Sequence, residues 1–380
     1  MAKSKVYKII GGAFVLACMA AAIGYSTLSN RHKAIVKTEF LHRTGLVDNQ
    51  WKIGDDRKTF KMLSPTLLID GIYKSMEGPK ASNYVQLSPD SSLIWITGFE
   101  VKAVDAKTRE RLSDDFICHT NIDFNDAKYF GGFGLSDRIG KHYPRMTSLS
   151  HGIENFHLPK GYGIPMRGND LLMVTTESLN HNLKDEHRWI KHEVAIDYGQ
   201  HDGQLKPLMS RTIFIMLPFD QKNPYKEPLD PAANSCIPVE TKNHTYDNGH
   251  GEKLSGHWVI PVGKKSYRSE VNSQLQLKDS LRLHAAAIHV HPFATSIALV
   301  DKTERQTIFT SRMINHKNRI GLEKVEDFVS EKGIWLYGDH EYELVLTVDN
   351  TSDIAQDMMG SAFLFFYDRE LEQKIRTGKK

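Results

Sequence analysis

Residues 91–104 read SSLIWITGFEVKAV, a run that is rich in β-branched and aromatic residues and therefore favours an extended strand. Similar runs, cut by Gly, Pro, Asn and Asp, follow along the rest of the chain. We expect further strands at residues 171–178, 189–198, 212–216, 258–262, 282–300, 306–310, 342–349 and 361–367. Long amphipathic helices are not expected, and only residues 370–376 suggest a short charged helix. The pattern predicts an all-β fold.

The length of 380 residues suggests two or three domains, and the prolines indicate where the chain divides. Residues 217–239 read LPFDQKNPYKEPLDPAANSCIPV and hold five of the 14 prolines. Because proline at this density favours an extended segment, we expect a linker at 218–239 between domains at 35–217 and 240–370. Many short, closely spaced strands in each block predict two tandem β-sandwich domains.

The N-terminal segment, residues 1–28, predicts export. Three lysines among the first eight residues precede an uncharged run at 9–28, which is long enough to cross a bilayer as a helix. We favour an uncleaved membrane anchor, with the rest of the chain on the extracytoplasmic side, periplasmic or extracellular. Two alternatives stay open: a cleaved signal peptide, for which residues 20–22 supply small side chains, and a lipoprotein modified at Cys18.

The charge balance argues against nucleic-acid binding. The chain has 49 Lys and Arg against 46 Asp and Glu, and three of the lysines lie in the N-terminal segment, which has no acidic residue. The rest of the chain therefore has no basic excess with which to attract a phosphate backbone.

The strongest chemical signal is AIHVHPF at residues 287–293. Alternate residues of a strand point to the same face, so His289 and His291 are expected to present two imidazoles side by side. Such a pair forms half of a site for copper or zinc, although the rings of an H-x-H pair can also face solvent or form hydrogen bonds. Met359, at a polar-to-apolar boundary, adds a thioether that suits copper(I). His284 lies five residues before His289, so its side chain is expected on the opposite face of a regular strand. We therefore expect it in the core or in a supporting position.

A second candidate set lies in the first block. Cys118 and His119 are adjacent after a strand-like segment, and His181 has a similar place further along the chain. Because neighbouring strand residues point to opposite faces, Cys118 and His119 reach one ion only across a distorted backbone. Six other histidines are scattered among polar residues, and we expect them in loops or on the surface. They are His142, His151, His157, His187, His192 and His201.

Together these motifs resemble the copper type II, ascorbate-dependent monooxygenases, the family of the peptidylglycine α-hydroxylating and dopamine β-monooxygenases. The resemblance spans residues 93–367. The sequence HVH at 289–291 matches the family's H-x-H, and Met359 matches the methionine before its last strand. The adjacent residues 118–119 align with a histidine pair of the family, and His181 aligns with a third histidine.

The resemblance implies two jelly-roll-like sandwiches side by side, each carrying one copper across a solvent-filled cleft. The second-block copper would bind O2 and hydroxylate a C–H bond of a small-molecule or peptide substrate. The first-block copper would receive electrons from ascorbate. The implied ligands are Cys118, His119 and His181 in the first block and His289, His291 and Met359 in the second.

Departures from the family pattern leave alternatives. A histidine of the family is replaced by Cys118, whose thiol would alter the copper potential and is open to oxidation. One alternative is therefore an exported copper-binding protein, such as a carrier, sensor or scavenger, on the same scaffold without oxygenase turnover. Another is a metal-free interaction module at the membrane surface. Ala287 stands where the peptide hydroxylase has an arginine for its substrate's carboxylate, so a peptide ending in glycine is not expected as the substrate.

Overall fold

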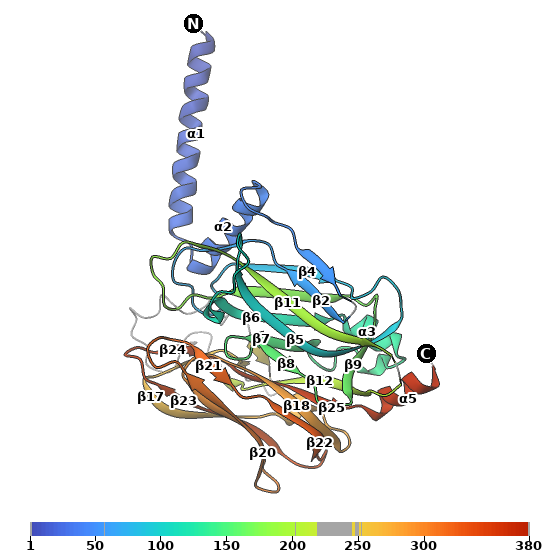
Figure 1. Cartoon of the computed structure of the whole chain (residues 1–380). Coiled ribbons are helices and arrows are strands. Elements are labelled where there is room, and N and C mark those ends of the chain that lie inside the picture. The colour runs from blue at the N-terminus through green and yellow to red at the C-terminus, as the bar shows by residue number, and fades with distance from the viewer. Residues whose placement is uncertain are drawn as a thin grey trace.

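The computed structural model describes most of the chain (Figure 1). The described residues are 2–56, 58–201, 203–218, 245–247, 251 and 253–378. The expected linker at 218–239 lies outside them apart from Pro218. Strands account for 49% of the residues and helices for 17%, so the predicted all-β class is confirmed.

Two helices precede the strands. α1 (Ala2–Ser26) stands away from the body of the molecule, and α2 (Asn30–Arg43) lies against it (Figure 1). Among the described residues, no helix combines the length and the apolar character needed to cross a membrane. An ion pair between Lys37 and Asp70 joins α2 to the first sandwich. The sequence analysis missed α2 because its apolar residues form no continuous stripe, and its C-terminal part lies inside the block expected to be β.

Two sheets form the first sandwich. One has the order β1 (Lys52–Asp55), β2 (Thr59–Leu63), β11 (Arg188–Gln200), β5 (Leu93–Asp105) and β9 (Tyr162–Arg167). Two short strands pair beside it, β3 (Leu67–Ile69) with β11 and β8 (Asn155–His157) with β5. The other sheet has the order β4 (Lys80–Val85), β10 (Leu172–Ser178), β6 (Ile117–Phe124) and β7 (Arg145–Ser150). Buried side chains such as Phe99, Ile122 and Val194 fill the core.

The second sandwich is built from later strands. Its first sheet has the order β12 (Lys206–Phe214), β25 (Gly360–Tyr367), β18 (Leu281–Val290) and β22 (Phe328–Leu336). Its second has the order β17 (Gly263–Glu270), β23 (Tyr342–Asn350), β19 (Ala294–Asp301), β20 (Gln306–Asn315) and β21 (Leu322–Val325). β16 (Trp258–Ile260) pairs with β24 (Gln356–Met358). A small sheet contains β13 (Leu217–Pro218), β15 (Lys253–Ser255) and β14 (Thr245–Asp247).

Short helices connect or end these strands. They are η1 (Asp114–Phe116), α3 (Asp126–Gly132), η2 (Ser136–Arg138), α4 (Asn272–Leu275) and α5 (Arg369–Thr377). α5 confirms the short charged helix expected near the C-terminus. Its N-cap is Asp368, whose side chain accepts a hydrogen bond from the backbone of Leu371 at 2.9 Å.

One strand joins the two sandwiches. β12 pairs antiparallel with β25 along its length, and its N-terminal end pairs in parallel with β9. β12 therefore belongs to the sheet of the second sandwich, although its residues lie within the block 35–217. β7 packs against β12 and β18 across the boundary between the two sandwiches, which we call the seam. As a result, the start of β6 lies close to the end of β18, and both places carry candidate ligands.

Candidate metal centre

The H-x-H pair lies at the end of β18, where strand alternation places both rings on one face. The ring centroids of His289 and His291 are 5.6 Å apart, and the ring planes are nearly perpendicular. The two residues are only 7% and 5% exposed, so the pair does not face solvent. His284 is fully buried, and its Nδ1 lies 2.9 Å from the carbonyl oxygen of Ser330. It therefore has the core position that its parity predicted.

Histidines of both sandwiches meet at this point. The ring of His119, in β6, lies 6.1 Å from the ring of His289. The ring of His257, just before β16, lies 5.4 Å from that of His291. We call His119, His257, His289 and His291 the histidine cluster. The resemblance implied two sites across a solvent-filled cleft, whereas here the H-x-H pair and His119 lie in one buried cluster.

Two carboxylates border the cluster, the buried Glu177 and the half-buried Asp357. Asp357 Oδ2 lies 2.9 Å from Nδ1 of His291, and Glu177 Oε2 lies 3.9 Å from Nε2 of His119. Glu177 is placed by strand register, because it lies directly opposite His119 in the pairing of β10 with β6. A carboxylate on Nδ1 orients an imidazole so that its Nε2 can bind a metal. Asp357 lies at the right distance from His291 for this role, but the two atoms form no hydrogen bond of acceptable geometry.

Burial favours the neutral form of two rings of the cluster, His119 and His289. It lowers the pKa of His119 to about 3 and that of His289 well below its usual range. The neutral ring is the form that binds metal ions. Burial alone would raise the pKa of Asp357, but its interactions with His291, His257 and His181 lower it to about 2, so this carboxylate is ionised. Burial raises the pKa of Glu177 to about 7.

The ring centres of the histidine cluster lie close enough for neighbouring rings to share an ion, but no three ligand atoms of the cluster and its carboxylates lie within 4.8 Å of one another. A histidine nitrogen binds such ions at about 2 Å, so the centres of two rings on one ion lie at most about 6.4 Å apart. The three neighbouring pairs of the cluster, at 6.1, 5.6 and 5.4 Å, satisfy this limit. Nδ1 of His289 is buried without a hydrogen-bond partner among the described residues, which is costly unless an ion or similar group meets it. Imidazoles and carboxylates fit copper(II) and zinc alike.

The remaining sequence-predicted ligands have different surroundings. Cys118 Sγ lies 3.3 Å from Nδ1 of His119, and burial raises the pKa of this thiol well above its usual value, which keeps it protonated. His181 follows β10, and burial lowers its pKa to about 4. The charge of Asp357 opposes this shift. Met359 is the half-buried residue between β24 and β25.

Sequence reasoning missed three members of this site. Asp357 shares strand parity with Met359 and could have been found from that spacing. Glu177 required the register between β10 and β6, and His257 lies in no recognisable motif. Two histidines expected in loops or on the surface are in fact buried, His151 at 6% exposure and His192 at 0%. His192 contacts Thr176, and both residues lie in strands of the first sandwich.

Comparisons with known proteins give no family. No family model matches the chain, and no curated protein matches it. Among solved structures, PNGase F, a glycosylasparaginase from Flavobacterium meningosepticum, is 9% identical and covers 80% of this chain and 96% of its own, with a TM-score of 0.34. The major capsid protein P2 of bacteriophage PM2 is 10% identical and covers 81% and 99%, with a TM-score of 0.29. Likeness this distant does not bear on function, so the resemblance to copper monooxygenases stays a prediction.

The buried histidines predict that the metal-free protein loses stability in mild acid. Burial lowers the pKa of His192 to about 4, below the value near 6.5 of an unfolded chain. The unfolded state therefore binds more protons between these values, and the unfolding free energy falls by about 1.4 kcal/mol per pH unit for this histidine as the pH drops from 6.5 to 4. Urea unfolding in chelator across this range measures the slope.

Matched variants identify which histidine makes the unfolding free energy depend on pH. His192→Gln is expected to reduce the slope, whereas His187→Gln, at an exposed histidine, is expected to leave it unchanged. Equal slopes in all three proteins would show that His192 is not a source of the acid sensitivity.

Proposed function

We propose that the protein is a copper-dependent monooxygenase that hydroxylates a C–H bond of an exported small-molecule or peptide substrate, with O2 and ascorbate. The observation that carries this proposal is the buried histidine cluster, in which the H-x-H pair lies next to His119 of the other sandwich. The choice of copper over zinc rests on the resemblance, since the residues present fit both ions.

Copper supplies the single-electron steps that O2 chemistry requires. In the overall reaction one oxygen atom enters the C–H bond, the other leaves as water, and ascorbate provides the two electrons. The chain's own contribution is positional and electrostatic. Asp357 would orient His291 through its Nδ1, and the buried surroundings hold the rings of His119 and His289 neutral and exclude bulk water. Glu177, with a pKa near 7, can hold or release a proton on Oε2 next to His119.

Copper content and oxygen consumption together test this proposal. Full-length protein is loaded with copper and dialysed, and copper per chain is measured with oxygen uptake in the presence and absence of ascorbate. We expect retained copper, with up to two ions per chain, and ascorbate-dependent uptake that rises when a substrate is present. Retained copper with no uptake under any condition would overturn the oxygenase activity but not the metal site.

Burial favours a second candidate function, a copper-binding protein without turnover. The histidines are nearly inaccessible, and a cavity of about 650 Å³ lies at the far ends of the same strands. Its lining includes Leu281 at the start of β18 and Tyr367 at the end of β25. A carrier, sensor or scavenger needs no substrate passage to the metal. Tight copper retention with no oxygen uptake is the result that this candidate predicts.

Met359→Ile separates the two candidates. If the thioether supports oxygen chemistry as the resemblance implies, this change is expected to abolish ascorbate-dependent uptake while the histidines retain copper. Met358→Ile is the matched control, because Met358 is fully buried and pairs with Trp258. A loss of uptake only in the Met358 variant would show that the assigned methionine is wrong by one residue.

We also propose that the sandwiches lie on the extracytoplasmic side of a membrane. The support is the basic start of the chain followed by an uncharged run at 9–28. Protease added outside intact cells or spheroplasts is expected to degrade the sandwiches. Protection from protease until the membrane is lysed would contradict this placement.

A further inference from the structure

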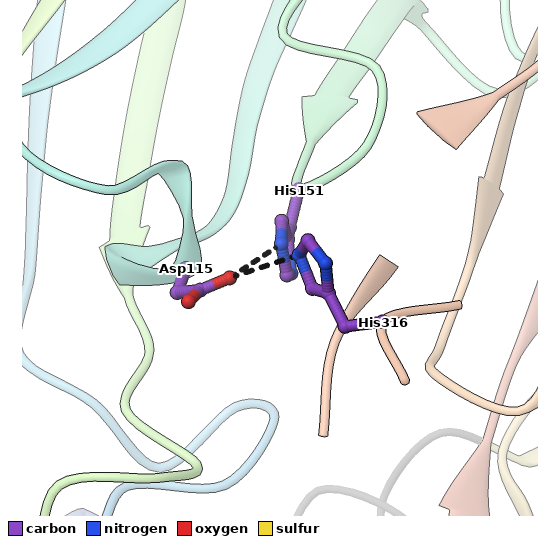
Figure 2. A group of neighbouring side chains, drawn as sticks. All are labelled: Asp115, His151 and His316. Atoms are coloured by element: carbon purple, nitrogen blue, oxygen red, sulfur yellow. Dashed lines mark ion pairs between the residues drawn. The ribbon is translucent and has the colours of Figure 1, made fainter. Parts of the chain in front are cut away.

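A second group of metal-ligating side chains lies outside the histidine cluster. Asp115, His151 and His316 each direct one ligand atom to a common point, and these atoms all lie within 4.8 Å of one another (Figure 2). Oδ1 of Asp115 is 2.8 Å from Nε2 of His151 and 3.6 Å from Nε2 of His316. No motif in the sequence brings these residues together, since they are far apart along the chain.

The group crosses the seam between the sandwiches. Asp115 belongs to η1 and His151 follows β7, both in the first sandwich, whereas His316 follows β20 in the second (Figure 2). The loop after β20 fits closely against this point. A Cβ on Gly321 would lie only 2.5 Å from Cε1 of His151, so glycine is needed for the approach.

We propose that Asp115, His151 and His316 bind a divalent transition-metal ion of the zinc type, at a site separate from the histidine cluster. Two imidazoles and one carboxylate are a ligand set that such ions accept, with the remaining positions left for water. The ligand atoms are already close enough to share an ion after small side-chain movements. Because the ligands come from both sandwiches, the ion would link the two across the seam.

The expected protonation states of Asp115 and His316 favour the binding of a cation between them. Burial alone would raise the pKa of Asp115, but contact with His151 and the charge of Arg319 lower it to about 2, so the carboxylate is ionised. Burial and the charge of Arg319 lower the pKa of His316, which favours the neutral ring. Oδ1 of Asp115 is buried and forms no hydrogen bond of acceptable geometry with the described residues, although Nε2 of His151 is close.

Arg319 occupies part of this space and competes with an ion. Its Nε lies 2.7 Å from Asp115 Oδ2, and its Nη2 lies 3.0 Å from Nε2 of His316. Its side chain is 45% exposed, so it can turn outward into solvent when a cation binds. The guanidinium therefore lowers the affinity for an ion without blocking the site.

The ion would also stabilise the loop that carries His181. The side chain of Asn182 donates to the carbonyl oxygen of Ile320 at 2.8 Å and accepts from the Ile320 backbone at 3.0 Å. These two bonds connect the His181 loop directly to the loop between His316 and Gly321. Fixing His316 on a metal therefore restrains the neighbourhood of the histidine cluster without adding a ligand to it.

Zinc titration of the full chain tests the site. The background is the double variant His289→Ala, His291→Ala, so that metal on the histidine cluster does not obscure the result. We expect this protein to retain zinc and to melt at a higher temperature with zinc than with chelator. His316→Asn is expected to remove that zinc and the thermal shift. Arg319→Gln is expected to tighten binding about tenfold, because it removes a positive charge beside the ion.

His340→Asn is the matched control. His340 also contacts an aspartate, Asp301, with 2.6 Å between Nδ1 and Oδ2, but both residues lie in the second sandwich and form no three-ligand group with another described residue. This variant is expected to keep the zinc. The proposal is overturned if the background protein binds no zinc, or if His316→Asn and His340→Asn retain it equally. Neither result depends on whether the protein is an oxygenase.

Discussion

Replacing both His289 and His291 with alanine is expected to abolish copper retention by the histidine cluster. Each ring is buried and close to another ring of the cluster, so the double change removes two of its four candidate ligands. We expect an affinity loss of at least ~100-fold, since changes even to groups behind the ligands cost 10–100-fold. The measurement is copper per chain after dialysis, with the Asp115 group removed by His316→Asn.

His284→Ala is the control for this experiment. His284 lies on the same strand and is fully buried, but its Nδ1 is close to Ser330 and its ring packs against Tyr162 at 4.1 Å. Its loss is expected to lower stability and leave copper content unchanged. Equal copper in the double variant and in the wild type would place the metal elsewhere.

Asp357→Asn has the second largest expected effect. Asp357 is an ionised, half-buried carboxylate 2.9 Å from Nδ1 of His291, a distance from which a carboxylate can orient a ligating imidazole. The amide keeps the shape of the side chain but loses its charge. We therefore expect copper affinity to fall ~10–100-fold, as measured by competition with a chelator of known affinity.

The chain offers a matched carboxylate as the control. Asp301 contacts Nδ1 of His340 in the same way, but outside the histidine cluster. Asp301→Asn is expected to leave copper affinity unchanged. If both aspartate variants bind copper as tightly as the wild type, then Asp357 does not support a metal ligand.

Strand positions could be predicted from the sequence where they depend on the pattern of neighbouring residues. The run expected at 342–349 lies within β23 (Tyr342–Asn350), whose side chains alternate between buried and half-buried along the whole strand. The helix α2 was not predictable because its apolar residues form no stripe. The pairing of β12 with β25 depends on packing between segments more than 140 residues apart, as Leu208 and Tyr367 show, and no local pattern specifies it.

The same distinction between local and long-range structure applies to the candidate site. The proximity of His289 and His291 follows from the two-residue repeat of one strand. The contact between His119 and His289 exists because two sandwiches meet, and Glu177 is beside His119 because two strands pair in one register. The sequence therefore indicates candidate ligands within one strand, whereas the proximity of the two blocks cannot be predicted from either block alone.

We propose that His119 of the first sandwich and His289 of the second belong to one metal centre. Electron paramagnetic resonance of copper(II)-loaded protein, compared between the wild type and His119→Ala, tests it most directly. One shared centre predicts that the copper held by His289 and His291 changes its spectrum when His119 is removed. An unchanged spectrum for that copper, with loss of a separate second ion, would show two independent sites and contradict the account.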